Sequence, residues 1–534
     1  MKNQPPSIFN DVIGPVMRGS SSSHTAASVR IGRIVRQCLP APCRCCRVEF
    51  DPEGSLASTY REQGADIGLA GGLLGMDLDD PDLAGALQLA RQENLDLSFA
   101  ITSLPADHPN TYRIKATAEN GEERQITALS TGGGMIEITR IDDFDVSIGG
   151  DFHETLLFYR DANSDTLKKY ERQLKELIDG YEYTEIARAG SEGLINLKTG
   201  YKLEDSSLEN LTLHTGARAA IRIEPALPVR SRKNCRVPFH DGESALVLAE
   251  NENLALWELA LRYESARGAI SKAEVYRMAE EVAGIMKQSV REGLAGTDYE
   301  NRILGPQARK MIKAGGKMIG DKLTTDLIAN ISAVMETKSA FGIIVAAPTA
   351  GSCGTLPGTF TAVAENMRLN KEQFVKGLLA AGLTGVLIAQ KSTFAAEECG
   401  CQAECGSASG MAAAGLIQMM EGSVEAGFDA AAMALQNVMG MVCDPVAERV
   451  EVPCLGKNVM AGLNALGCAN MALAGYDKVI PLDETIGAMH SCGRMLPPEL
   501  RCTGRGGLSV TGTAQKIYEN LKNIRTNDDK RINF

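Results

Sequence analysis

Aromatic and basic side chains are scarce in this sequence. Phe, Tyr and Trp together make up 5% of the 534 residues, with a single Trp, and there are six His. Acidic residues outnumber Lys and Arg by 67 to 55, which gives a net charge of −12. Nucleic-acid binders usually show a basic face with stacking aromatics, and anionic membranes attract basic clusters. The composition therefore argues against both kinds of partner.

The sequence also shows no obvious leader or membrane span. The first residues, MKNQPPSIFNDVIG, lack a basic stretch followed by an apolar run, so no signal peptide is expected. The most apolar stretch, 374–390, contains Lys376 and falls short of the ~20 residues that cross a bilayer. A buried core helix is the better interpretation, and a cytoplasmic protein is expected.

Cysteine, by contrast, is abundant, with fourteen in the chain. In the reducing compartment that we expect, clustered cysteines are more often metal ligands or catalytic groups than disulfides. Cys399, Cys401 and Cys405 stand close together, but their C-x-C-x3-C spacing matches neither the usual zinc nor the common ferredoxin spacing. Small buried thiols are an equally good interpretation. That interpretation is favoured for a second group, Cys43, Cys45 and Cys46.

The first part of the chain, residues 1–155, mixes strand and helix patterns. Residues 124–150 resemble strands separated by glycine turns, and residues 24–39 predict a helix with a mostly apolar face. An α/β or α+β domain is therefore predicted.

The rest of the chain divides into two regions. Residues 156–240 begin with a charged amphipathic helix over 164–183 and continue as a polar, irregular stretch. We interpret them as a connector or insertion with structure of its own. Residues 241–534 predict a mainly α-helical domain rich in Ala, Gly and Met, including a Ser-capped helix over 271–294.

Two polar segments could carry chemistry. RGSSSSHTAA, residues 18–27, places hydroxyls before a predicted helix, where a carboxylate could bind, and His24 could act as a general acid or base. An over-capped helix start on the surface is an equal alternative. APTAGSCGTLPGTF, residues 347–360, is a glycine-rich loop in an apolar context, and either a site or a simple interhelical turn fits it.

The longer motifs, taken in order, resemble those of the iron–sulfur-dependent L-serine dehydratases, or L-serine ammonia-lyases. The first part resembles the family's β subunit through IGPVMRGSSSSHTAASVRIGR, HPNTYRI and STGGGMIEI followed by FDVSIGGD. The last part resembles its α subunit through APTAGSCGTLPGT, GCQAECGSASGMAAAG, CDPVAERVEVPC, NVMAGLNAL and TGRGGL. The resemblance implies β and α parts fused in one chain, an amino-acid substrate and a homodimer.

The resemblance implies a [4Fe–4S] cluster held by the cysteines of GCQ, CDP and VPC, here Cys401, Cys443 and Cys454. Cys399 and Cys405 are not expected to be ligands. Three thiolates leave one iron open to act as a Lewis acid. The implied reaction is a β-elimination without pyridoxal phosphate. A base removes the Cα proton, hydroxide leaves, and the resulting enamine yields a 2-oxo acid and ammonia.

The family resemblance also implies a site between domains, where small ligands commonly bind. The catalytic candidates are His24, His108 and Ser22, with the base left open among the two histidines and a deprotonated serine. The implied substrate-binding residues are Ser21, Ser23, Thr25, Thr349, Lys457 and Asn458.

This sequence departs from the family pattern near the implied site. Ser20 replaces a Pro, Lys457 an Arg and Arg505 a Gln, and the segment before GCQ carries Glu397 and Glu398. The two carboxylates could recognise a cationic group on a substrate other than L-serine, or they could be solvated surface charges. The small regulatory domain that often ends the family's β subunit is expected to be absent, with residues 156–240 in its place.

Three rival functions remain open. One is β-elimination of a thiol from L-cysteine or a related substrate, as in a desulfidase. The second is a non-catalytic protein that binds a cluster or an amino acid. The third is a zinc structural protein, which iron and sulfide analysis would distinguish.

Overall fold

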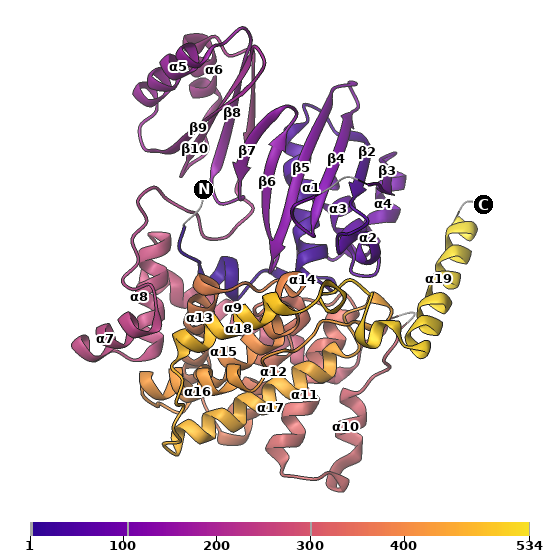
Figure 1. Ribbon diagram of the computed structural model, residues 1–534, viewed down its shortest axis with the longest axis vertical. Coiled ribbons are helices and arrows are strands. Elements are labelled where there is room, and N and C mark those ends of the chain that lie inside the picture. The colour runs from indigo at the N-terminus through magenta and orange to yellow at the C-terminus, as the bar shows by residue number, and fades with distance from the viewer. Residues whose placement is uncertain (1–3, 104–105, 300–301, 533–534) are drawn as a thin grey trace.

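Two sheets and a body of packed helices make up the fold (Figure 1). The computed structural model describes residues 4–103, 106–299 and 302–532, with side chains except at 316 and from 525 onward. The strands lie in the first part of the chain, and the second part is almost entirely helical. The predicted fold class, an α/β N-terminal part followed by a mainly α-helical part, is confirmed.

A six-stranded sheet forms the centre of the N-terminal part, in the order β3-β2-β4-β5-β6-β7. Only the β2–β3 pair is parallel. The strands are β2 (Cys43–Phe50), β3 (Asp96–Ile101), β4 (Thr111–Ala118), β5 (Glu123–Gly132), β6 (Met135–Ile141) and β7 (Phe144–Ile148). Residues 124–150 are therefore strands, as predicted.

Two helices, α1 (Ala27–Cys38) and α3 (Ala65–Leu74), pack closely against each other beside this sheet. A Cβ at Gly72 would come within 2.2 Å of the Val29 carbonyl oxygen, so the crossing requires glycine. Buried side chains of α1, α3 and the sheet form one hydrophobic core. Two short helices complete this part, α2 (Leu56–Thr59) and α4 (Ala86–Gln92). The packing fixes the start of α1, where residues 18–27 lie.

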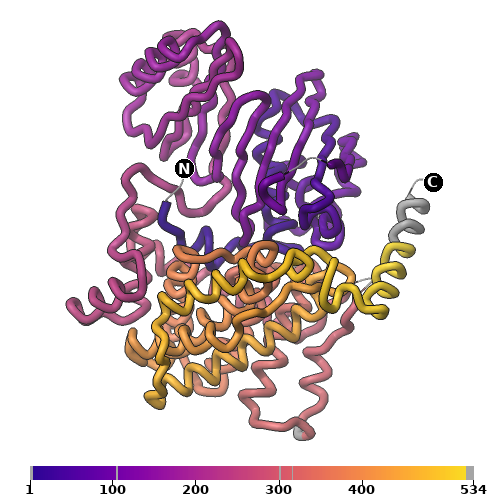
Figure 2. The backbone as a smooth tube through the Cα atoms, viewed as in Figure 1, coloured from indigo at the N-terminus to yellow at the C-terminus, as the bar shows by residue number. Residues whose placement is uncertain are grey.

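The stretch interpreted as a connector contains a complete βαββαβ unit. Its strands pair antiparallel in the order β11-β8-β10-β9, which is the ferredoxin-like arrangement. The elements are β8 (His153–Tyr159), α5 (Ser164–Leu177), β9 (Tyr181–Ala189), β10 (Glu192–Thr199), α6 (Asp205–Thr215) and β11 (Ala219–Ile223). Residues 156–240 therefore lie largely within a small folded unit that follows the β-like part. Figure 2 shows this unit set apart from the helical body.

The helical body is built around α13, which packs against α15, α8 and α9. Its helices include α7 (Gly242–Glu252), α8 (Leu256–Gly268), α9 (Lys272–Ala295), α10 (Ala308–Ala314), α11 (Lys322–Ser339), α12 (Thr355–Met367), α13 (Lys371–Lys391), α14 (Ala396–Cys399), α15 (Ser407–Met419), α16 (Val424–Gln436), α17 (Cys454–Leu473), α18 (Leu482–Met495) and α19 (Gly512–Ile532). The predicted helix over 271–294 is α9, and the Ser271 hydroxyl caps it by accepting from the Glu274 N–H.

Helix α13 is the apolar stretch predicted to be a buried core helix, and that prediction is confirmed. By length and composition it could cross a membrane, but 78% of its apolar window is buried inside the protein. No other helix in the described part of the chain passes that test. The N-terminal turn Ile8–Val12 packs on α13 so closely that a Cβ at Gly385 would lie 2.1 Å from Val12 Cγ1.

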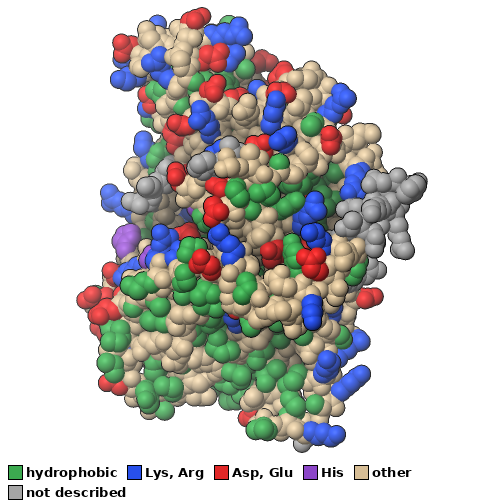
Figure 3. Space-filling view, turned by 45° about the vertical axis from the view of Figure 1, so that its right-hand side comes forward, with side chains coloured by type: hydrophobic (Ala, Val, Ile, Leu, Met, Phe, Trp, Pro, Cys, Tyr) green, Lys and Arg blue, Asp and Glu red, His purple; other side chains and the backbone are tan. Residues whose placement is uncertain are grey.

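A short strand joins the two halves directly. Strand β1 (Val16–Met17) leaves the N-terminal turn and pairs with β12 (Ile344–Val345) of the helical body. The chain then enters residues 18–27 on one side and residues 347–360 on the other, so these two polar segments meet. In the view of Figure 3, hydrophobic side chains gather over the helical half and charged ones over the sheet half.

Candidate active site

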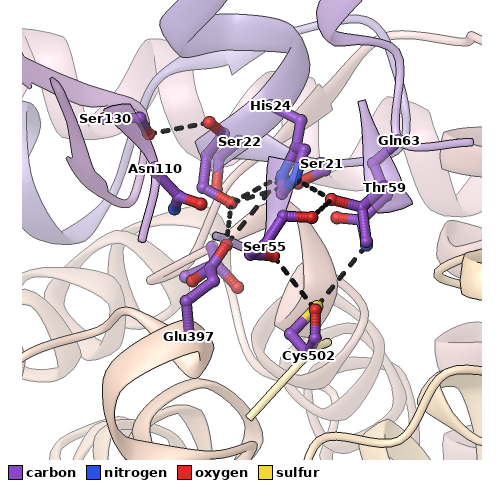
Figure 4. A network of polar contacts seen from close by, with 12 residues as sticks. Ser21, Ser22, His24, Ser55, Thr59, Gln63, Asn110, Ser130, Glu397 and Cys502 are labelled. Carbon is purple, nitrogen blue, oxygen red and sulfur yellow. Dashed lines mark hydrogen bonds and ion pairs between the residues drawn. The ribbon is translucent and has the colours of Figure 1, made fainter. Parts of the chain in front are cut away.

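The hydroxyl-rich segment reaches the helical body through a π-helical turn, Ser22–Ala26, that precedes α1. Ser21 and Ser23 line a small cavity between the two halves, together with Glu397, Cys443 and Cys454 from the helical body. This cavity therefore lies between the two parts of the chain. Figure 4 shows the polar network that crosses this boundary.

His24 is completely buried at the centre of that network. Its Nε2 lies 2.7 Å from Thr59 Oγ1, and the Thr59 hydroxyl donates to the Ser55 carbonyl oxygen. Because that hydroxyl has one proton, His24 Nε2 must donate to Thr59, which we infer from the hydrogen bonds alone. His24 Nδ1 is then an acceptor. Burial lowers the pKa of His24 to about 4, against a smaller opposing effect of Glu397, so the ring is neutral near pH 7.

The acceptor nitrogen of His24 faces two serine hydroxyls. Ser21 Oγ and Ser23 Oγ each lie 3.1 Å from Nδ1. Ser23 donates its proton to Glu397 Oε1 at 2.8 Å, so it is Ser21 that can donate to Nδ1. This arrangement connects a hydroxyl on the cavity wall to an imidazole that can take up a proton.

Glu397 is 7% exposed and lines the cavity, so the interpretation of it as a solvated surface charge is wrong. Its Oε1 lies 3.9 Å from His24 Nδ1 in addition to accepting from Ser23. Glu398 is only half-buried and faces Arg494 at 3.2 Å and His108 Nε2 at 3.8 Å. The two neighbouring carboxylates therefore occupy different environments.

The three cysteines of GCQ, CDP and VPC come from separate elements. Cys401 directly precedes the π-helical turn Gln402–Gly406, Cys443 forms a bridge with Arg501, and Cys454 begins α17. Hydrogen bonding to the Cys401 and Cys502 thiols, followed by burial, raises the pKa of Cys443. Burial and then Cys401 raise the pKa of Cys454. Cys401 thus affects the pKa of both Cys443 and Cys454.

The other two cysteines of the local cluster are placed differently. Cys399 Sγ points toward α18, 3.9 Å from His490 Nδ1. Cys405 is buried behind Asn458, whose Nδ2 lies 3.6 Å from its sulfur. Of these five cysteines, Cys443 and Cys454 line the cavity, whereas Cys399, Cys401 and Cys405 do not.

A carboxylate accompanies the thiols. A Glu404 oxygen and the sulfurs of Cys401 and Cys443 lie within 4.8 Å of one another, the one such group of His, Cys, Asp and Glu found among the described residues. Glu404 accepts from the Thr349 hydroxyl at 2.6 Å, and burial raises its pKa to about 7. Thr349, expected to bind substrate, therefore already has a protein partner that lines the cavity.

Lys457 lies beside the thiols. Its ammonium donates to the Val442 carbonyl oxygen at 2.6 Å and to Asp444 Oδ1 at 2.9 Å, and lies 3.7 Å from Cys401 Sγ. An ammonium has three donors, so all of them are engaged. Lys457 therefore links the Cys401 turn to the segment that carries Cys443.

Asn458 is fully buried and its amide is satisfied by protein groups. Oδ1 accepts from the Gly354 and Thr355 N–H groups, each at 3.1 Å. Nδ2 donates to the carbonyl oxygens of Gly351 and Cys454 at 2.8 and 2.9 Å. Asn458 thus ties the 347–360 loop to the start of α17.

The remaining candidates of the N-terminal part differ in position. Ser22 Oγ accepts from the Ala350 N–H and does not line the cavity. Thr25 donates to the Gln63 carbonyl oxygen at 2.8 Å. His108 sits at the edge beside Glu398, and burial lowers its pKa. Of the four consecutive serines at 20–23, Ser21 and Ser23 line the cavity.

Sequence reasoning missed four residues here. Gln63 and Cys502 line the cavity, with Gln63 Nε2 3.5 Å from the Cys502 sulfur, and Thr59 fixes His24. No local pattern marks these three, because only the tertiary fold brings them near. Glu404 could have been found, since it follows Cys401 by three residues and a helical turn places such pairs on one face.

Comparison with known proteins agrees with this geometry. Residues 251–509 match the family model described as "Serine dehydratase alpha chain". A probable L-serine dehydratase alpha chain of Bacillus subtilis is 35% identical over 285 residues, which are 53% of this chain and 95% of that one. The probable beta chain from the same organism is 34% identical over 208 residues, 39% of this chain and 92% of that one.

A single-chain relative matches across both parts. An L-serine dehydratase of Streptomyces coelicolor is 27% identical over 422 residues, 77% of this chain and 84% of that one. The fold, the interdomain site and these matches make the protein an enzyme of the lyase class. The chain belongs to the iron–sulfur L-serine dehydratase family.

Proposed function

We propose that this chain dehydrates and deaminates L-serine, or a closely related β-hydroxy amino acid, with a [4Fe–4S] cluster and without pyridoxal phosphate. The observation that carries the proposal is one small cavity on which the Cys443 and Cys454 thiols, the Ser21 hydroxyl and the Glu397 carboxylate converge. The names of the matched relatives support the same reaction.

The donor set fits a cluster held by Cys401, Cys443 and Cys454. Hydrogen bonding to Cys401 and Cys502 and then burial raise the pKa of Cys443, and burial and then Cys401 raise the pKa of Cys454. Bound iron would reverse this effect by stabilising the thiolates, and soft thiolates are the donors that iron–sulfur clusters require. When bound, the cluster would supply a Lewis-acidic iron for the leaving hydroxyl.

The chain's own residues can supply the proton chemistry. Ser21 Oγ lies on the cavity wall and can give a proton to His24 Nδ1, whose other nitrogen Thr59 holds protonated. The neutral state of His24 keeps Nδ1 free to receive that proton near pH 7. We therefore assign the removal of the Cα proton to the Ser21–His24 pair, in preference to Ser22 or His108.

Glu397 departs from the family pattern, which raised the question of whether the substrate carries a cationic group that L-serine lacks. The α-ammonium of L-serine is itself a cation, so L-serine already has a group that this carboxylate could bind. Ser23 holds Glu397 at the boundary between the two halves. We propose that Glu397 binds the α-ammonium group of the substrate. Lys457 and Asn458 would hold the thiol-bearing segments in place.

A substrate panel on anaerobically reconstituted protein tests the proposal. L-serine or a related β-hydroxy amino acid such as L-threonine should yield a 2-oxo acid and ammonia, and D-serine and L-cysteine should be poor substrates. Release of sulfide from L-cysteine at a higher kcat/KM would establish the desulfidase alternative instead. Zinc in place of iron, or no turnover of any amino acid, would contradict the proposal. A cytoplasmic homodimer stays a prediction from the family resemblance.

A further inference from the structure

A second, larger cavity lies away from the thiols. It measures about 430 Å³ and opens between the N-terminal segment, α1, residues 225–228 and α9. Most of its wall is apolar, formed by side chains that include Phe9, Ile13, Leu78, Leu227, Met278 and Val282. A cavity of this size accommodates a small organic molecule. None of the residues assigned to the reaction lines it.

One buried charge faces this apolar cavity. Arg30 of α1 lines the cavity and is 2% exposed. Its Nη1 donates to the Gly134 carbonyl oxygen at 2.5 Å, but its Nε has no hydrogen-bond partner among the described residues. No ion pair within 4.0 Å is found for Arg30 in the same part of the chain. A buried guanidinium with unmet donors is costly unless an anion completes it.

The nearest opposite charge compensates Arg30 poorly. Asp11 acts on Arg30 through space, but burial raises the pKa of Asp11, which weakens its negative charge. Burial also lowers the pKa of Arg30 to about 10, as expected for a cation without a close partner. Arg33 pairs with Asp77 at the rim and so does not compete for a ligand inside. Two further acids, Asp79 and Glu281, stand exposed on the rim.

We propose that this cavity binds a small carboxylate with an apolar body, its carboxylate on Arg30 and its hydrocarbon against the apolar wall. The rim acids Asp79 and Glu281 would accept an ammonium group, so amino acids with apolar side chains are the ligand class that best matches all three features. Guanidinium binds carboxylate through paired, charge-assisted hydrogen bonds.

Two sets of contacts connect the cavity to segments of the active site. Val16 of the cavity wall pairs with Val345, two residues before the loop 347–360 that carries Thr349. Arg30 holds the Gly134 carbonyl, and Gly132 of the same turn packs so tightly that its Cβ would lie 3.0 Å from Ala395 Cβ. Ala395 precedes Glu397 by two residues. A ligand that shifts either contact therefore acts on the assigned substrate groups, which makes this an effector site.

Titration calorimetry on the reconstituted full chain tests the binding. The probes are L-leucine, 4-methylpentanoate and the neutral 4-methylpentanamide. Both carboxylates should bind saturably, and the amide should bind at least about tenfold more weakly because it cannot form the charge-assisted bonds. Equal affinity for the amide and the acid, or no saturable binding of either carboxylate, would overturn the proposal.

A matched pair of variants on α9 locates the site. Val282→Trp fills the cavity and should abolish binding of 4-methylpentanoate. Ile285→Trp adds similar bulk on the same helix outside the cavity wall and should leave binding unchanged. Binding that survives in Val282→Trp would place the ligand elsewhere and contradict the assignment. Arg30→Lys, which keeps the charge but loses the forked donors, should weaken the carboxylate and not the amide.

The effect of ligand binding on the active site depends on the proposed reaction. It is measured separately from binding, by the kinetics of L-serine turnover. Saturating L-leucine should change the half-saturating concentration of L-serine at least about twofold, and Val282→Trp should remove the change. An unchanged value with calorimetric binding intact would refute the coupling while leaving the proposed reaction untouched. Absence of serine turnover would refute the reaction while leaving the calorimetric result standing.

Discussion

Ser23 donates a 2.8 Å hydrogen bond to Glu397, a residue 374 positions away in the other half of the chain. Both side chains line the same cavity, and Glu397 is 7% exposed. The bond fixes a carboxylate at the boundary between the hydroxyl-rich segment and the thiol site. It is one of several polar links between the part that resembles a β subunit and the part that resembles an α subunit, together with the bond from the Ala350 N–H to Ser22 Oγ.

The role of Glu397 predicts a defect in substrate binding. Glu397→Gln keeps an acceptor for Ser23 but removes the charge that would face the α-ammonium. We expect KM for L-serine to rise about tenfold or more, since a hydrogen bond to a charged group contributes about 1.5–3 kcal/mol, with a smaller change in kcat.

Glu398→Gln is the matched control for that variant. It makes the same chemical change one residue away, where the carboxylate is half-buried and faces Arg494 and His108. Steady-state kinetics should show a change of less than about threefold, as for partly exposed pairs. A KM defect of equal size in both variants would argue against the assignment of Glu397.

The ligand assignment predicts which thiols hold iron. Cys401→Ser, Cys443→Ser and Cys454→Ser should each lose most of their iron and sulfide after anaerobic reconstitution, along with the visible absorption of the cluster. Cys399→Ser and Cys405→Ser should keep both. Iron retention in Cys443→Ser, or its loss in Cys399→Ser, would require a different ligand set.

Buried, neutral His24 predicts a pH-dependent stability. Its pKa is about 4 when folded and about 6.5 when unfolded, so the unfolded chain binds more protons between those values and stability falls as pH drops through 6.5. From about pH 7.5 to about pH 5.5, this residue should cost about 1 kcal/mol. Urea unfolding of wild type and His24→Gln at both pH values should show that difference, with the variant less pH-sensitive. Equal pH sensitivity would mean that His24 titrates normally.

The satisfied amide of Asn458 predicts a large effect on stability. Asn458→Ala leaves two backbone N–H groups and two carbonyl oxygens without their buried partner. The free energy of unfolding should fall by about 2–4 kcal/mol. Asn470→Ala, on the exposed side of the same helix, should change it by less than about 0.5 kcal/mol in the same denaturant experiment.

The sequence predicted those parts of the fold and the candidate site that lie in contiguous motifs. Residues 18–27 and 347–360 both reach the site, and the buried helix α13 follows from its apolar run. Local pattern could not decide which serine faces the cavity, because a π-helical turn sets the direction of Ser21, Ser22 and Ser23. It also could not find Thr59, which reaches His24 only through the packing of α1 beside the sheet.

The βαββαβ unit was missed for a different reason. Strand β9 has no fully buried position and carries several polar residues, so no apolar face marks it as a strand. Its partner β10 is nearly all buried, but only pairing with both β8 and β9 makes it a central strand.

Mössbauer spectroscopy of 57Fe-reconstituted protein, with and without L-serine, tests the central claim most directly. A cluster held by Cys401, Cys443 and Cys454 should contain about four irons per chain, and L-serine should change the signal of one of them while the other three stay the same. Absence of iron, or a four-iron spectrum that L-serine leaves unchanged, would contradict the account.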